Sequence, residues 1–141
     1  MSYLLDTNAV IALLTNRPPT VRERLRLEAS ASRSIGISSI VLFELWSGVA
    51  RSQHRAQNAE RLRAFLAGNI SVFAFAEEDA AIAGDLRAEL DKAGTPIGPY
   101  DLLIAAQALR AGTTLVTANV NEFRRVRDLV WQDWTQPGVS T

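Results

Sequence analysis

Short apolar stretches typical of buried strands alternate along the chain with longer stretches of helical spacing. In the longer stretches apolar residues recur every three or four positions, which is the period of an amphipathic helix. Strands are expected at residues 3–5, 34–38, 70–75 and 114–118, with a last short apolar piece at 129–131. Because alternating strands and helices build a sheet covered on both faces, the sequence predicts an α/β fold: a three-layer α/β/α sandwich with a mostly parallel central sheet.

Proline, glycine and capping residues separate the expected helices, which lie at residues 8–14, 18–29, 39–50, 56–67, 77–94 and 99–112. Pro99 suits the first turn of its helix, and Gly68, Gly94 and Gly112 suit helix ends. In the second helix Val21, Leu25 and either Leu27 or Ala29 are expected to face inward. A short segment, NVNEFRRV, follows the strand at 114–118.

The composition describes one globular domain over residues 1–141. Hydrophobic residues make up 48% and charged residues 21% of the chain, and we find no repeat, linker or low-complexity tract. There is no cysteine, which excludes a disulfide scaffold, a thiolate metal site and a cysteine nucleophile. The first residues carry no Lys or Arg and soon reach Asp6, and no apolar run attains the roughly 18 residues of a membrane span. We therefore expect a cytoplasmic protein.

The charge of the chain is balanced overall but unevenly distributed. The chain has fifteen basic and fifteen acidic residues, yet the segment from residue 17 to residue 63 contains nine arginines and only four acids. Guanidinium groups fit phosphates bidentately, so this half could bind a phosphate-bearing substrate, with Arg51 and Arg55 as the predicted contacts. Solvated helix faces are the alternative interpretation of the same arginines.

Three carboxylates stand alone in otherwise uncharged segments: Asp6 within residues 1–16, Glu44 within 34–50 and Asp101 within 93–109. A lone buried carboxylate costs several kcal/mol unless it has a partner, and none of these segments contains Lys, Arg or His. The economical solution is that the three converge and share a cation. As alternatives, Asp6 could only cap a helix, Asp101 could only complement a helix dipole, and Glu44 could lie on a wet helix face.

The expected positions of these acids support a metal site at one edge of the sheet. Asp6 ends the first strand, where ligands bind in open parallel sheets, and Asp101 lies in the first turn of its helix. Asn119 and Glu122 follow the strand at 114–118 and are candidate secondary metal or water-positioning residues. Oxygen ligands without His or Cys suit Mg²⁺, or Mn²⁺, rather than Zn²⁺.

Four blocks of the sequence together resemble the PIN domain family, and specifically its VapC-type toxin ribonucleases; they are LLDTNAVIALL, ISSIVLFELWSG, GTPIGPYDLLIAAQAL and LVTANVNEF. The resemblance covers nearly the whole chain. It implies a Rossmann-like sandwich in which Asp6, Glu44 and Asp101 gather Mg²⁺ or Mn²⁺ to hydrolyse RNA phosphodiester bonds, with a tRNA or rRNA loop as the expected target.

The resemblance also implies a small cognate antitoxin that blocks the active-site groove, and a homodimer within the toxin–antitoxin complex. The family often has a fourth acid where Asn119 stands here, and Glu122, three residues on, is the candidate substitute. Since a neutral amide adds no charge, a second metal ion is in question at this position.

Alternative functions remain open at the level of sequence. The main one is a non-catalytic RNA-binding or protein-interaction module with a degraded metal site. A phosphoacceptor receiver domain would need a lysine after a late strand, and Lys92 is expected at a helix end; a haloacid-dehalogenase phosphatase would need Asp where Asn8 stands. His54 is expected to be a solvated loop residue, and Trp131 and Trp134 to close the core or to contact a partner.

Overall fold

The computed structural model describes residues 2–137, and its five strands form a single sheet in the order β3-β2-β1-β4-β5. Every neighbouring pair of strands is parallel, which confirms the predicted fold class. The strands are β1 (Ser2–Leu5), β2 (Ser34–Ser38), β3 (Ser71–Phe73), β4 (Thr114–Val116) and β5 (Trp131–Gln132).

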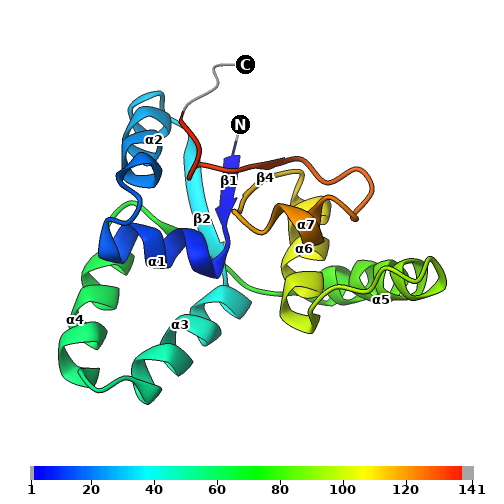
Figure 1. Cartoon of the computed structure of the whole chain (residues 1–141), viewed down its shortest axis with the longest axis horizontal. Helices are drawn as coiled ribbons and strands as arrows, with labels where there is room; N and C mark the ends of the chain where they lie inside the picture. Colours follow the sequence, from blue (N-terminus) through cyan, green and yellow to red (C-terminus); the bar gives the residue numbers. More distant parts are fainter. Residues whose placement is uncertain (1, 138–141) are drawn as a thin grey trace.

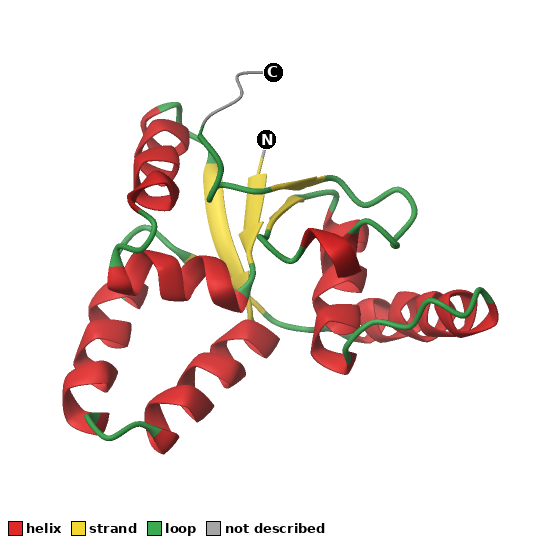
Figure 2. Cartoon of the chain, in the orientation of Figure 1, coloured by secondary structure: helices red, strands yellow, loops and turns green. Residues whose placement is uncertain are grey.

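Seven helices connect and cover the strands: α1 (Thr7–Thr15), α2 (Pro19–Ser30), α3 (Ser39–Arg51), α4 (Arg55–Leu66), α5 (Glu77–Lys92), α6 (Pro99–Ala111) and α7 (Val120–Phe123). Figure 1 shows α1, α2 and α4 on one side of the sheet and α5, α6 and α7 on the other. Helix α3 runs past the carboxyl ends of the strands, between the two groups, and contacts α1, α4 and α6. Figure 2 shows the strands enclosed by these helices, so the predicted three layers are present.

The central strand β1 is the most deeply buried part of the sheet. Leu4 and Leu5 are at most 1% exposed, and the facing residues Ile37 and Leu115 are fully buried. Because β1 is paired on both sides and covered on both faces, it carries a continuous apolar run, as parallel strands do. The residue that follows it, Asp6, is consequently drawn into a buried position.

The helix ends follow the capping signals of the sequence closely. Asp6 and Ser38 cap α1 and α3 through their side chains. Pro99 occupies the first position of α6, and Gly94 and Gly112 adopt the left-handed φ values of +72° and +64° after α5 and α6. Gly68 is different: α4 ends at Leu66, its cap is Ala67, and a left-handed glycine is not used there.

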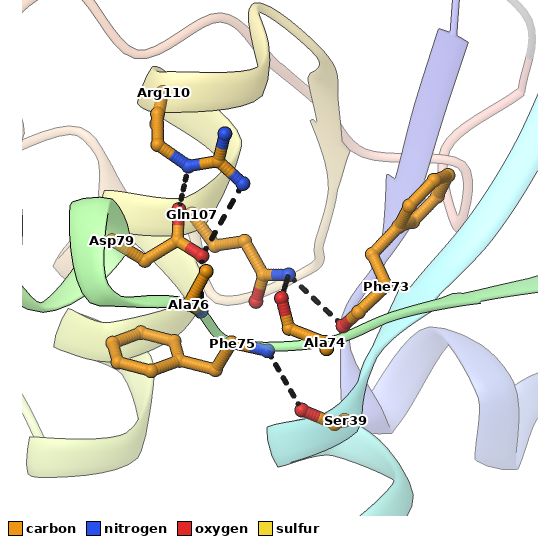
Figure 3. Close-up of polar contacts among 8 residues, drawn as sticks. All are labelled: Ser39, Phe73, Ala74, Phe75, Ala76, Asp79, Gln107 and Arg110. Atoms are coloured by element: carbon orange, nitrogen blue, oxygen red, sulfur yellow. Dashed lines mark hydrogen bonds and ion pairs between the residues drawn. The ribbon is translucent and has the colours of Figure 1, made fainter.

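The strand expected at 70–75 is shorter than predicted, because side chains replace the ladder beyond Phe73. Strand β3 lies at the edge of the sheet and pairs only with β2. Figure 3 shows the amide of Gln107 donating to the carbonyl oxygens of Phe73 and Ala74, at 3.0 and 3.3 Å, and the backbone N–H of Phe75 donating to Ser39 at 2.9 Å. The chain is thereby turned away from the sheet and into α5.

Two further observations complete the fold. In α2 only Val21 is fully buried, and Leu27 is 65% exposed, so the prediction that Leu27 or Ala29 faces inward is wrong. The reason is that α2 packs mainly against α1, which buries a narrow stripe of α2.

Among residues 2–137, no helix combines the length and the apolar character needed to cross a membrane.

Candidate active site

The strand order reverses at β1, which has β2 on one side and β4 on the other. In open parallel sheets such a switch point leaves a crevice at the carboxyl ends of the strands, and ligands bind there. Asp6 follows β1 at this point, and its N–H donates to the carbonyl oxygen of Val116 at 3.0 Å. Thr117 and Asn119 follow β4 immediately, so both strand ends contribute polar side chains to the same crevice.

Asp6 is 4% exposed, and its side chain accepts a hydrogen bond from the backbone N–H of Ala9 at 2.8 Å. Burial raises the pKa of Asp6 above its usual value, because it disfavours the charged form. Hydrogen bonds from Thr117 and Ala9 oppose this rise in pKa, and the negative charges of Glu44 and Asp133 add to it. Asp6 is therefore both a helix cap and a member of an acidic group.

Glu44 is half-buried in α3 and faces Thr7, the residue that follows Asp6. The hydroxyl of Thr7 donates to Glu44 Oε1 at 2.8 Å, across the contact between α1 and α3. This hydrogen bond holds one carboxylate oxygen in place and leaves the other free of any protein hydrogen bond among the described residues. The helix face that carries Glu44 therefore belongs to the site rather than to open solvent.

Asp101 and Glu122 are joined through the amide of Asn119. The Asn119 Nδ2 atom donates to Asp101 Oδ2 at 3.3 Å and to Glu122 Oε2 at 3.0 Å. The backbone N–H of Gly98 adds a hydrogen bond to Glu122 Oε1 at 3.3 Å. Asn119 thus bridges the two acids through a single amide nitrogen.

Burial raises the pKa of Asp101 to about 7, and the hydrogen bond to Glu122 together with the charges of Glu122, Asp6 and Glu44 contributes to the rise. The pKa of Glu122 is lowered in turn, chiefly because the Asp101 carboxyl hydrogen-bonds to it. Two adjacent carboxylates cannot both ionise easily, so the proton stays on the more buried one. Within residues 2–137, no ion pair involves Asp6, Glu44, Asp101 or Glu122.

The donor set fits a hard cation by its chemistry, although no cage is preformed. Within the described part of the chain, no three acidic or histidine side chains are already arranged around a common point for a metal ion. The hydrogen bonds explain this, because Glu44 is turned toward Thr7 and Asn119 holds Asp101 and Glu122. The ligand atoms on offer are all oxygens, the carboxylates repel one another, and within residues 2–137 no basic side chain forms an ion pair with them. Mg²⁺ and Mn²⁺ occupy environments of this kind in proteins.

The two arginines predicted as phosphate contacts do not lie beside the acids. Arg51 is seven residues beyond Glu44, about 10 Å along the helix, and both Arg51 and Arg55 are exposed at the far end of the α3–α4 pair. Arg61 of α4 instead lines a cavity of about 290 Å³ together with Glu44. That cavity lies between α1, α3 and α4, so one basic residue lines the same cavity as one of the candidate acids.

The sequence analysis missed Arg61 and Asp133 as members of this region. Asp133 follows β5, the strand next to β4, and the carboxyl end of a parallel strand is the signal that could have found it. Other expectations agree with the structure: His54 is exposed before α4, and Trp134 is 3% exposed and packs edge-on against Tyr3 at 5.2 Å between ring centroids.

Comparison with known proteins gives one consistent result. The PIN domain profile matches residues 3–129. The chain is 39% identical to Ribonuclease VapC2 of Rickettsia felis, over 95% of this chain and 98% of that protein, and 37% identical to the tRNA(fMet)-specific endonuclease VapC of Shigella flexneri, over 96% and 99%. A crystal structure of VapBC2 from Rickettsia felis, bound to a DNA fragment from the promoter, superposes with a TM-score of 0.89 at 38% identity, covering 95% of this chain and 99% of that one.

The acids Asp6, Glu44 and Asp101 fall inside the matched region, at the sheet edge where the strand order reverses. The match covers nearly the full length of both chains, and the fold and the sequence agree. The chain belongs to the PIN domain family and, within it, to the VapC proteins.

Proposed function

We propose that this protein is a metal-dependent endoribonuclease that uses Mg²⁺, or Mn²⁺, to hydrolyse phosphodiester bonds in a loop of tRNA or rRNA. The observation that carries the proposal is the pair Asp6 and Asp101. Both carboxyls have raised pKa values at the carboxyl edge of the sheet, and among residues 2–137 neither forms an ion pair. Such a pair is stabilised by a bound cation, and functional sites are where such pKa shifts gather.

Asp6 and Asp101 are the residues that would hold the cation, with Glu44 as a further ligand or as the group that orients the attacking water. Glu122 would be a secondary ligand or would position a water. When bound, the cation supplies charge neutralisation at the phosphate and activates water for attack. Glu44, fixed by Thr7, has one carboxylate oxygen available to accept a proton. Asn119 keeps Asp101 and Glu122 side by side. Attack by water leaves a 5′-phosphate and a 3′-hydroxyl, and the RNA 2′-hydroxyl takes no part.

The names of the relatives support RNA as the substrate. One is called a ribonuclease, and another, at 37% identity over almost its whole length, is called specific for tRNA(fMet). Loops are the accessible targets, because their unstacked bases can be contacted by a protein. Several similar solved structures are complexes of a VapC with its partner VapB. We extend this to the present chain as a toxin, acting in the cytoplasm, that a small antitoxin neutralises and that forms a homodimer within that complex.

The nuclease proposal is tested with the purified full chain and a panel of tRNA and rRNA fragments. We expect cleavage with Mg²⁺ or Mn²⁺, no cleavage in EDTA, and products that carry a 5′-phosphate. Asp6→Asn and Asp101→Asn should lower the cleavage rate by at least about 100-fold while circular dichroism and thermal unfolding show an intact fold. Asp91→Asn, an exposed acid of α5, is the matched control. Unimpaired cleavage by either site variant, or cleavage in EDTA, contradicts the proposal.

The toxin role has a separate test in living bacteria. Brief expression of the wild-type chain should arrest growth and produce discrete cuts in cellular RNA, which end-mapping would locate. Asp6→Asn should do neither at the same protein level, and Asp91→Asn should behave as wild type. Growth that continues while the RNA is cut would separate the nuclease from the toxin role.

A further inference from the structure

Two exposed aromatic side chains directly precede two of the candidate acids in the sequence and have no role in the chemistry proposed above. Phe43 of α3 immediately precedes Glu44, and Tyr100 of α6 immediately precedes Asp101. Their ring centroids are 5.7 Å apart and the ring planes are inclined at 54°, so the two rings contact each other where α3 meets α6. Consecutive Cα atoms are about 3.8 Å apart, so the backbone that carries each ring adjoins the backbone of a candidate catalytic carboxylate.

Both rings are exposed to an extent unusual for side chains of this size. Phe43 is 54% and Tyr100 is 45% exposed. The two rings are tilted rather than stacked face to face. Aromatic rings in a protein favour offset or inclined packing, and a third flat ring can add to such a pair.

The local chemistry favours a nucleobase as the occupant. The acids beside the rings repel the phosphates of RNA, whereas a base is neutral and stacks on an aromatic face whatever its sequence. On α3 and α6 the exposed large apolar side chains are Phe43 and Tyr100 alone. By themselves, the two rings present far less than the roughly 800 Å² per partner that a stable protein interface buries. Their size matches one base.

We propose that Phe43 and Tyr100 form a stacking platform for the nucleobase next to the phosphate that is cut. The platform rests on the proposed ribonuclease function and adds to it, since it holds the RNA by a base rather than by a phosphate. Stacking increases with ring area, so a purine at this position binds more tightly than a pyrimidine. Phe43 and Tyr100 are positioning residues for the substrate.

The test measures binding of single-stranded oligoribonucleotides that carry 2-aminopurine at successive positions. All proteins contain Asp6→Asn, which keeps the RNA intact. We expect fluorescence quenching at one position on binding. Phe43→Ala and Tyr100→Ala should abolish the quenching and weaken binding about 5- to 100-fold, with the salt dependence unchanged because no phosphate contact is lost. Phe43→Tyr and Tyr100→Phe should retain both, and Leu27→Ala, exposed on α2, is the control.

Unchanged quenching and affinity in the alanine variants overturn the platform. The platform is also overturned if sedimentation shows that the alanine variants change oligomeric state and this change alone accounts for the loss of RNA affinity. The rings would then belong to a contact between protein chains. Failure of the proposed function is distinguishable: a parent chain that binds RNA but never cuts it refutes the nuclease and leaves the quenching test in force. A parent that binds no RNA at all overturns both.

Discussion

Asp6 combines a structural and a chemical role in one side chain. It caps α1 through the N–H of Ala9, and its buried charge faces Glu44 and Asp133. Substitution by Asn keeps a side-chain oxygen for the cap and removes the charge, whereas Ala removes both. A cap of this kind contributes about 1 kcal/mol, so Asp6→Asn is the variant that isolates the chemistry from the fold.

The pKa of Asp101 predicts how the stability of the metal-free protein depends on pH. In the folded chain this pKa is raised from 3.8 to about 7, so between these values the folded state binds more protons than the unfolded state. Stability contributed by this group is therefore present at pH 4 and is lost as the pH rises to 7. Asp101→Asn, which is neutral throughout, should gain on the order of 1 kcal/mol over the wild type at pH 7, after allowance for solvent screening.

Thermal unfolding in EDTA between pH 4 and pH 8 measures this difference. The melting temperature of Asp101→Asn should exceed that of the wild type by a few degrees at pH 7, and the two should converge near pH 4. The exposed Asp91→Asn variant is the control, with no expected change of slope. If the melting temperatures of the wild type and Asp101→Asn change with pH in the same way, the raised pKa of Asp101 is not the cause of the pH dependence.

At the scale of elements, the edge strand β3 depends on the absence of a side chain in β2. A Cβ atom at Gly36 would lie 2.2 Å from the ring of Phe73 and 2.9 Å from the carbonyl oxygen of Ser71. We expect Gly36→Ala to destabilise the fold by about 1–3 kcal/mol, because the ring and the strand must both shift. Adding Phe73→Ala should recover part of this loss, since only the backbone clash then remains.

Urea unfolding of the single and double variants tests this expectation. Gly84→Ala is the matched control: Gly84 lies inside α5, and a Cβ atom there meets nothing within 4 Å. It should stabilise the chain by up to about 1 kcal/mol, because alanine favours helix. Equal stability of Gly36→Ala and the wild type would show that β3 is free to move aside.

Elements whose partners are local were predictable from the sequence, and those whose partners are distant were not. Pro99, Gly94 and Gly112 mark helix ends because each acts on neighbouring residues, and the structure confirms them. The end of β3 depends on Gln107, about thirty residues away, which no local pattern reveals. Leu27 fits an inward helical face by periodicity, but only the packing of α2 against α1 decides how wide that face is.

The same division applies to the candidate site. Asp6, Glu44 and Asp101 stood out because each is the only charge in its segment, and the structure draws them to the same edge of the sheet. Arg61 and Asp133 have no such local signal, since each reaches the site through the packing of an element far along the chain. The phosphate role of Arg51 and Arg55 stays a prediction.

At the scale of the whole molecule, zero net charge conceals an acidic site with arginines on the neighbouring helices. Arg61 lines the cavity that contains Glu44, whereas Arg127 is 76% exposed and pairs with Glu89. We expect Arg61→Ala to weaken RNA binding and to reduce the slope of log affinity against log salt by about 0.7, the value for one phosphate contact on a single strand. Arg127→Ala should leave the slope unchanged.

Binding titrations at several salt concentrations, in the Asp6→Asn protein, make this comparison. Arg51→Ala and Arg55→Ala belong in the same series, because the slope tells directly whether each contacts a phosphate. If none of the four substitutions changes the slope of log affinity against log salt, the arginines of α3 and α4 are solvated surface residues. RNA is then held by other groups.

The position of β1 in the sheet has a consequence for synthesis of the chain. This strand is made long before its second neighbour, β4, and before the residues Asn119 and Glu122. Closing contacts between such distant segments is slow and needs both of them outside the ribosome. If the chain cuts RNA, its acidic site is therefore incomplete until synthesis has passed Glu122, and a copy that stops before β4 lacks both Asn119 and Glu122.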